Sequence, residues 1–134
     1  MNIHIDDNKS IAAVQKEFAD AFPYLRLEFF AEPHMFGAGS ARRDMLDHKT
    51  KLKECRLKAE GNMIIRPEMT VSDLEKHFKE KYRLFVQVFR RSGKLWLETT
   101  ATDKWTLKYQ NEQGQELSNT TFNDREEVDY HEQE

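Results

Sequence analysis

The sequence carries one hydrophobic pattern twice, at a constant spacing of sixty positions. In each copy a hydroxyl residue, Ser10 or Thr70, precedes a stripe of apolar residues at helical spacing. Any two amphipathic units share such a stripe, but a constant spacing across strand, cap and helix favours an internal duplication covering 2–31 and 62–91. The matched apolar pairs are Ile5 with Ile65, Ile11 with Val71, Val14 with Leu74, Phe18 with Phe78, and Phe22 with Tyr82.

Both copies contain a predicted helix. The first follows Ser10 and ends at Phe22, because a proline at position 23 disfavours helix at the residue before it. The second follows Thr70 and carries its apolar stripe as far as Tyr82. Two pairs fit a capping arrangement at its start, Thr70 with Asp73 and Ser72 with Glu75.

Alternating apolar residues predict a strand on either side of each helix, over 2–6, 25–29, 63–65 and 84–89. Each copy is therefore a βαβ-like unit that places an apolar helix face on a sheet. Two such units side by side predict an α+β fold, a two-layer α/β sandwich that is ferredoxin-like or related.

The chain continues after the second unit with a predicted hairpin and a short helix. Ser92-Gly93 lies between two alternating runs, which is typical of a two-residue hairpin turn. Thr102 and Asp103 are candidate caps for a final helix that ends near Gly114. The turn predicts three cross-strand pairs, Phe89 with Trp96, Val88 with Leu97, and Gln87 with Glu98.

A length of 134 residues fits one domain, which we place at 1–115. The connection 32–61 has no clear period, and we expect a short helix over 41–48 within an otherwise mobile segment. Residues 118–134 hold six acidic residues and one basic residue, with few aliphatic ones. This composition predicts an acidic, disordered tail over 116–134.

The predicted location is the cytoplasm. Cys55 is the single cysteine, so the chain forms no internal disulfide and gives no sign of an oxidising compartment. The first residues alternate like a strand rather than forming a signal peptide, and no run of about 18 apolar residues is present. We expect no membrane association.

The stretches FPYLRLEFF (22–30), TVSDLEKHF (70–78) and VQVFRRSGKLWLETTATDKWTLKYQN (86–111) resemble a family of small bacterial proteins to which no biochemical activity is attached. The resemblance extends up to about Gly114. It implies a bacterial cytosolic protein and assigns no catalytic residue.

A glycine-containing stretch in the connection is the best candidate for binding a small anion. Glycines allow backbone amides to approach an anion, and a helix start with nearby arginines attracts negative charge. The stretch lacks the Gly-Lys-Ser/Thr ending of a P-loop and the third glycine of a dinucleotide fingerprint, so a flexible loop leading into a helix is the alternative. The candidate residues are Gly37, Gly39, Ser40, Arg42 and Arg43.

The same connection is basic over 42–58, with seven basic and three acidic residues. Such a segment can lie along a phosphate backbone, which makes nucleic-acid binding the second function hypothesis. Aromatic residues are not interleaved with it, and no nucleic-acid signature is present. A solvated face, or a face docked on the acidic tail, is the other interpretation.

Nothing in the sequence assembles into catalytic chemistry. His34, His48 and Cys55 share the connection, but their spacing matches no zinc pattern. Cations near Cys55 favour its thiolate, yet no base for it is identifiable. Glu98 is expected on a strand and Asp103 at a helix cap, rather than together in a pocket. We predict a protein that is not an enzyme, with no metal and no cofactor.

The hairpin gives the leading function hypothesis. One sheet face holds Phe85, Phe89 and Trp96, where a two-layer fold normally has polar residues, and Arg91 lies at its rim. Either the C-terminal helix covers these rings, or they form an interface with a second copy or another protein. We therefore predict a protein-interaction module, with homodimerisation through this face as its simplest form.

Overall fold

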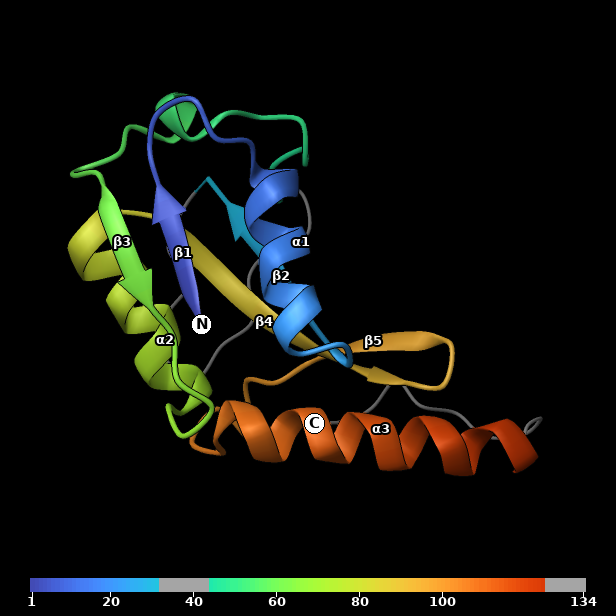
Figure 1. Cartoon of the computed structure of the whole chain (residues 1–134). Coiled ribbons are helices and arrows are strands. Elements are labelled where there is room, and N and C mark those ends of the chain that lie inside the picture. The colour runs from blue at the N-terminus through green and yellow to red at the C-terminus, as the bar shows by residue number, and fades with distance from the viewer. Residues whose placement is uncertain (32–43, 125–134) are drawn as a thin grey trace.

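The computed structural model describes residues 1–31 and 44–124, and shows an α+β fold with two antiparallel sheets and three helices (Figure 1). This arrangement is compatible with a two-layer α/β sandwich. In chain order the elements are β1 (Asn2–Ile5), α1 (Ile11–Ala21), β2 (Leu25–Phe30), the 3₁₀ turn η2 (Leu52–Cys55), β3 (Gly61–Ile64), α2 (Val71–His77), the π-helical turn η3 (Phe78–Tyr82), β4 (Phe85–Ser92), β5 (Leu95–Glu98) and α3 (Leu107–Asp124).

The strands of each unit lie in different sheets. β1 pairs with β3 in a two-stranded ribbon, and β2, β4 and β5 form a three-stranded sheet in that order. A ferredoxin-like fold places all four unit strands in one sheet, so the ferredoxin-like prediction is not confirmed. The physical reason is that β2 pairs with β4 of the other unit instead of with β3.

Both pairings between the units are centred on equivalent residues. In the β1–β3 ribbon Ile3 lies opposite Met63, sixty positions later, and the antiparallel pairing continues from that pair in both directions without a bulge. In the β2–β4 pairing Glu28 lies opposite Gln87, which corresponds to it at a spacing of fifty-nine. Both registers are those that an approximate two-fold axis between the units produces.

The two helices begin where the sequence predicts. The Ser10 hydroxyl accepts a hydrogen bond from Ala13 N at 3.1 Å, and the Thr70 hydroxyl accepts one from Asp73 N at 3.0 Å. Asp73 completes the capping box by accepting from Thr70 N. α1 ends at Ala21, whereas α2 is continued to Tyr82 by the π-helical turn.

The segment after each unit returns to the start of that unit's helix. Ile11 N donates to Thr50 O at 2.9 Å, and its equivalent Val71 N donates to Trp105 O at 3.1 Å. Leu52 and Leu107, fifty-five positions apart, are both fully buried beneath these segments. Backbone hydrogen bonds therefore join residues 44–53 to the first unit, and Lys58 bonds to the second unit at Tyr82 O. The mobility expected of the connection stays a prediction. The first half of that connection, 32–43, lies outside the described residues.

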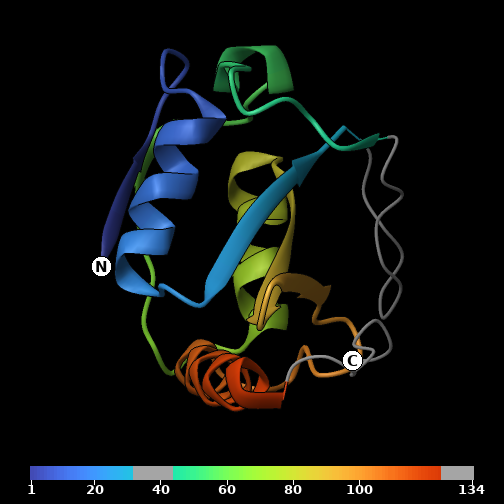
Figure 2. The same cartoon turned by 90° about the vertical axis from the view of Figure 1, so that its right-hand side faces the viewer.

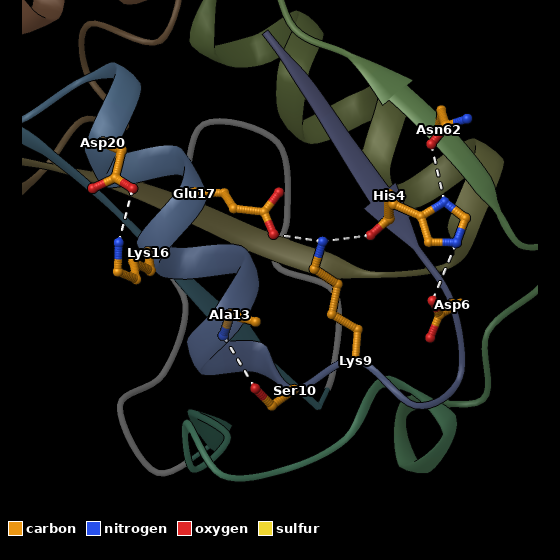
Figure 3. Close-up of polar contacts among 9 residues, drawn as sticks. All are labelled: His4, Asp6, Lys9, Ser10, Ala13, Lys16, Glu17, Asp20 and Asn62. Atoms are coloured by element: carbon orange, nitrogen blue, oxygen red, sulfur yellow. Dashed lines mark hydrogen bonds and ion pairs between the residues drawn. The ribbon is translucent and has the colours of Figure 1, made fainter.

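The core lies between the three-stranded sheet on one side and α1 with the β1–β3 ribbon on the other (Figure 2), and α2 adds Val71 and Leu74 to it. Lys9 fastens the start of α1 to β1, because its ammonium group donates to His4 O at 2.8 Å and pairs with Glu17 at 2.7 Å (Figure 3). Fully buried core residues come from every layer: Ile3, Ile5, Val14, Phe18, Leu25, Leu27, Met63, Leu74, Phe78 and Val88.

Two local predictions are wrong in detail. The hairpin turn is Gly93-Lys94, so Phe89 lies opposite Glu98 and Trp96 lies opposite Arg91, a shift of two residues that leaves every side chain on its predicted face. Gly93 adopts φ +65°, which explains why the turn is built on it. Residues 44–48 form no α-helix, because Met45 makes a bridge with Phe30 instead.

The last helix is longer than expected. α3 begins at Leu107, after Trp105, and continues through Gly114 to Asp124. Residues 116–124 of the predicted tail are therefore helical, and 125–134 lie outside the described residues. Gly114 does not end the helix because it serves as a close-contact position, where a Cβ atom would lie 2.8 Å from Tyr24 Cβ.

Candidate interaction surface

The predicted aromatic side chains lie on the sheet face that points away from the core. Phe85, Phe89 and Arg91 alternate along β4 with the buried Val86, Val88 and Arg90, and Gln87, on the same face as the two phenylalanines, is also fully buried. Trp96 of β5 lies opposite Arg91, so it belongs to the same face. We call Phe85, Phe89, Arg91 and Trp96 the aromatic face. The three rings are half-buried and Arg91 is exposed.

Arginine side chains stack on two of the rings. The Arg26 guanidinium lies 5.4 Å from the centre of the Trp96 ring and pairs with Glu28 at 2.9 Å. The Arg83 guanidinium lies 5.5 Å from the centre of the Phe85 ring. Cation–π contacts of this kind place guanidinium groups over the rings, and Glu28 offsets the charge of Arg26.

The C-terminal helix does not supply the predicted cover. Gln110 of α3 accepts a hydrogen bond from Arg90 Nη1 at 3.1 Å, and the Arg90 guanidinium lies 5.6 Å from the centre of the Trp105 ring. Arg90 alternates with the aromatic face and points to the core side. Since Leu107 is part of the core as well, α3 packs on the core side of the sheet.

β5 leaves one edge of the three-stranded sheet without a described strand beside it. Arg91 N donates to Tyr24 O, which shows that odd-numbered residues of β4 point their backbone groups toward β2. Even-numbered residues of β4 then bond to Leu95 and Leu97, and the backbone groups of Trp96 point outward. Leu95 keeps 41% of its surface exposed, so this edge carries an accessible apolar side chain.

β5 ends before it reaches Val88 of β4, and side chains hydrogen-bond the backbone groups of Val88 in its place. The Glu75 carboxyl accepts a hydrogen bond from Val88 N at 3.2 Å, and the Thr99 hydroxyl donates to Val88 O at 2.8 Å. Burial, opposed by the Val88 hydrogen bond and assisted by the charge of Asp103, raises the pKa of Glu75 to about 8. The sequence suggested Glu75 only as a capping partner of Ser72. In the structure it lies beside the apolar stripe of α2, four residues after Val71, and its carboxyl reaches Val88 of the sheet.

The five candidate anion-binding residues, Gly37, Gly39, Ser40, Arg42 and Arg43, lie outside the described residues. The remaining basic residues of the connection are exposed: Lys49, Lys51, Lys53, Arg56 and Lys58. Burial and the charge of Glu54 raise the pKa of Cys55, so its thiol stays protonated at neutral pH. Within 1–31 and 44–124 no three His, Cys, Asp or Glu side chains converge on a possible metal position.

No helix in the described part of the chain is both long and apolar enough to cross a membrane. Comparisons with protein-family models, with curated proteins and with solved structures return no significant match. The resemblance to a bacterial family therefore stays a prediction, and any assignment of function depends on the surfaces described above.

Proposed function

We propose that the protein is a non-enzymatic interaction module that forms a homodimer by pairing β5 with β5 of a second copy. The observation that carries the proposal is the outer edge of β5, beside which no strand of the described residues lies and whose sequence is self-complementary. Antiparallel pairing centred on Trp96 joins the two three-stranded sheets into one continuous sheet, with the aromatic faces of both copies on the same side.

The backbone alternation fits this register. Trp96 points its N–H and C=O groups outward, so two copies of it form a hydrogen-bonded pair at the centre. By the same alternation the backbone N–H and C=O groups of Lys94 and Glu98 also point outward. The register sets Lys94 of one copy opposite Glu98 of the other. Cross-strand pairs of opposite charge stabilise a sheet, so the charges favour this register.

The side chains also complement each other on both faces. The two Trp96 rings become neighbours across the centre, beside Phe89 of each copy. On the opposite face Leu95 meets Leu97 of the second copy, which covers a side chain that is 41% exposed in the single chain. Neither Lys94 nor Glu98 has an ion-pair partner among the described residues, so both are available to the second copy.

A strand of this length gives a small interface. Edge pairing over five residues with its neighbouring rings buries less than about 1,200 Å², the range of transient complexes. We therefore expect a dimer whose dissociation constant is on the order of micromolar, so that its population changes with protein concentration.

Sedimentation velocity over a concentration series tests the proposal. The wild-type protein should shift from monomer to dimer between roughly 1 µM and 1 mM. Trp96→Ala should remove the shift, whereas Tyr109→Ala, which changes an exposed aromatic residue of α3, should retain it. A wild-type chain that stays monomeric throughout would refute the homodimer. The nucleic-acid alternative stays a prediction, since part of its basic segment is outside the described residues.

A further inference from the structure

A cavity of about 260 Å³ lies where the end of β2 meets the start of β4 and the turn η2. Its inner wall is apolar: Phe29, Phe30 and Leu84 are buried, and Leu46 packs against the core. Its rim carries Arg56 and Arg83 together with Glu54 and Cys55. The cavity is separate from the β5 edge, although Phe85 of the aromatic face contributes to its wall.

The two rim arginines share an unusual backbone conformation. Arg56 ends η2 at φ +60° and Arg83 ends the π-helical turn at φ +59°. They are the only residues other than glycine with positive φ in the described chain. Glycine is favoured at such left-handed helix ends because it has no Cβ, so arginine at both is a costly choice. Both arginines line the same cavity, and a binding role there explains why arginine occupies these positions in spite of the conformational cost.

Hydrogen bonds hold the two arginine turns side by side. Lys58 N donates to Tyr82 O at 3.1 Å, and the Lys58 ammonium group donates to Glu80 O at 3.1 Å. Arg83 is further placed by the Phe85 ring. Neither Arg56 nor Arg83 has a carboxylate partner within the residues described, so the positive charge at the rim is uncompensated by an ion pair.

The remaining rim groups define the chemistry. The Glu54 carboxyl accepts a hydrogen bond from Lys51 N at 3.1 Å, so one of its oxygens is engaged in the turn. Cys55 is half-buried and packs against the core, where an uncharged thiol forms part of an apolar wall. A ligand for this cavity thus needs an anionic group for the arginines and a small apolar body for the wall.

We propose that the cavity binds a small organic anion, with its phosphate or carboxylate between Arg56 and Arg83 and its apolar part against Phe29 and Leu84. A guanidinium group forms bidentate hydrogen bonds with a phosphate and with a carboxylate, so the two arginines can bind either anion. Occupancy covers Cys55, which is the single cysteine of the chain and therefore reports on the cavity alone.

Alkylation of Cys55 by iodoacetamide, followed by intact-mass spectrometry, tests this with three probes: phenyl phosphate, phenylacetate and inorganic phosphate. At about 10 mM, at least one aromatic probe should slow alkylation severalfold, and whichever protects better identifies the preferred headgroup. Inorganic phosphate should protect less, because it lacks the apolar body. Equal protection by inorganic phosphate, or none by either aromatic probe, would overturn the proposal.

Arg83→Gly and Arg56→Gly separate binding from folding. Glycine suits φ near +60°, so both variants should unfold at the same temperature as the wild type or higher. Each should nevertheless weaken probe binding about tenfold, measured by chemical-shift titration. Arg66→Gln, at an exposed arginine that does not line the cavity, is the matched control and should bind as the wild type does. Unchanged affinity in both glycine variants would refute the arginine site.

Discussion

Glu28 lies directly opposite Gln87 at the centre of the β2–β4 pairing, and the two residues hold the same position in their respective repeats. Ile3 and Met63 have the same relationship in the β1–β3 ribbon. Two strand pairings centred in this way relate the units by one approximate two-fold axis. Equivalent positions in the two units should therefore make equivalent contributions to stability.

The helix caps allow that equivalence to be measured. Ser10→Ala and Thr70→Ala each remove a side-chain acceptor for the backbone N–H three residues later. Each should lower the free energy of unfolding by about 1 kcal/mol in urea denaturation. Ser72→Ala, one residue inside α2, should change it by less than about 0.5 kcal/mol. A cap whose loss costs nothing would show that the two helix starts are not equivalent.

Gly114→Ala should destabilise the protein although alanine favours helix. A Cβ atom at this position would lie 2.8 Å from Tyr24 Cβ and 3.1 Å from Arg90 Cγ. Tyr24 Cβ is fixed close to the backbone, so α3 must move away from β2 and β4. We expect a loss of roughly 1–3 kcal/mol, which exceeds the gain in helix propensity of about 1 kcal/mol.

Gln115→Ala is the matched control for Gly114→Ala, because residue 115 is the exposed neighbour in the same helix. It should leave the free energy of unfolding within about 0.5 kcal/mol of the wild type. If Gly114→Ala proved more stable than the wild type, the close packing of α3 on the sheet would be wrong.

Glu75 should make stability depend on pH. Its pKa in the folded protein is raised from 4.5 to about 8, so the folded state keeps a proton that the unfolded state has lost between these values. Stability from this group is fully present below about pH 4.5 and falls as the pH rises toward 8, by at most roughly 1.4 kcal/mol per unit.

Glu75→Gln isolates this effect from other titrating groups. The amide oxygen can still accept from Val88 N, and Gln15 holds the equivalent position in α1. Relative to the wild type, the variant should gain stability as the pH rises from 5 to 8 in urea denaturation. Glu68→Gln, at an exposed site, should follow the wild type at every pH. Parallel curves for the wild type and Glu75→Gln would refute the raised pKa.

The local elements were predictable because each depends on neighbouring residues. The stripe after Ser10, the capping box at Thr70 and the alternation along 84–89 fix helices and strands without reference to the rest of the chain. Alternation also predicted that Phe89 and Trp96 point away from the core. The error in the hairpin register is two residues, and an even shift leaves each side chain on the same face of the sheet.

The pairing of strands was not predictable from these patterns. Alternation in β2 is satisfied equally by β3 or β4 as a neighbour, so the apolar pattern does not choose between one sheet and two. The correspondence between the buried Leu52 and Leu107 was missed for a different reason. They correspond at a spacing of fifty-five, because the stretches that precede them differ in length, and a search at a constant spacing of sixty does not align them.

Charge reversal at the ends of β5 tests the homodimer most directly. In the proposed register Lys94 of one copy faces Glu98 of the other, so Lys94→Glu and Glu98→Lys each place like charges opposite one another. Sedimentation velocity should show both single variants as monomers at concentrations where the wild type is a dimer. The double variant, which restores opposite charges, should recover the dimer. A double variant that stays monomeric, or single variants that dimerise as the wild type does, would contradict antiparallel pairing centred on Trp96.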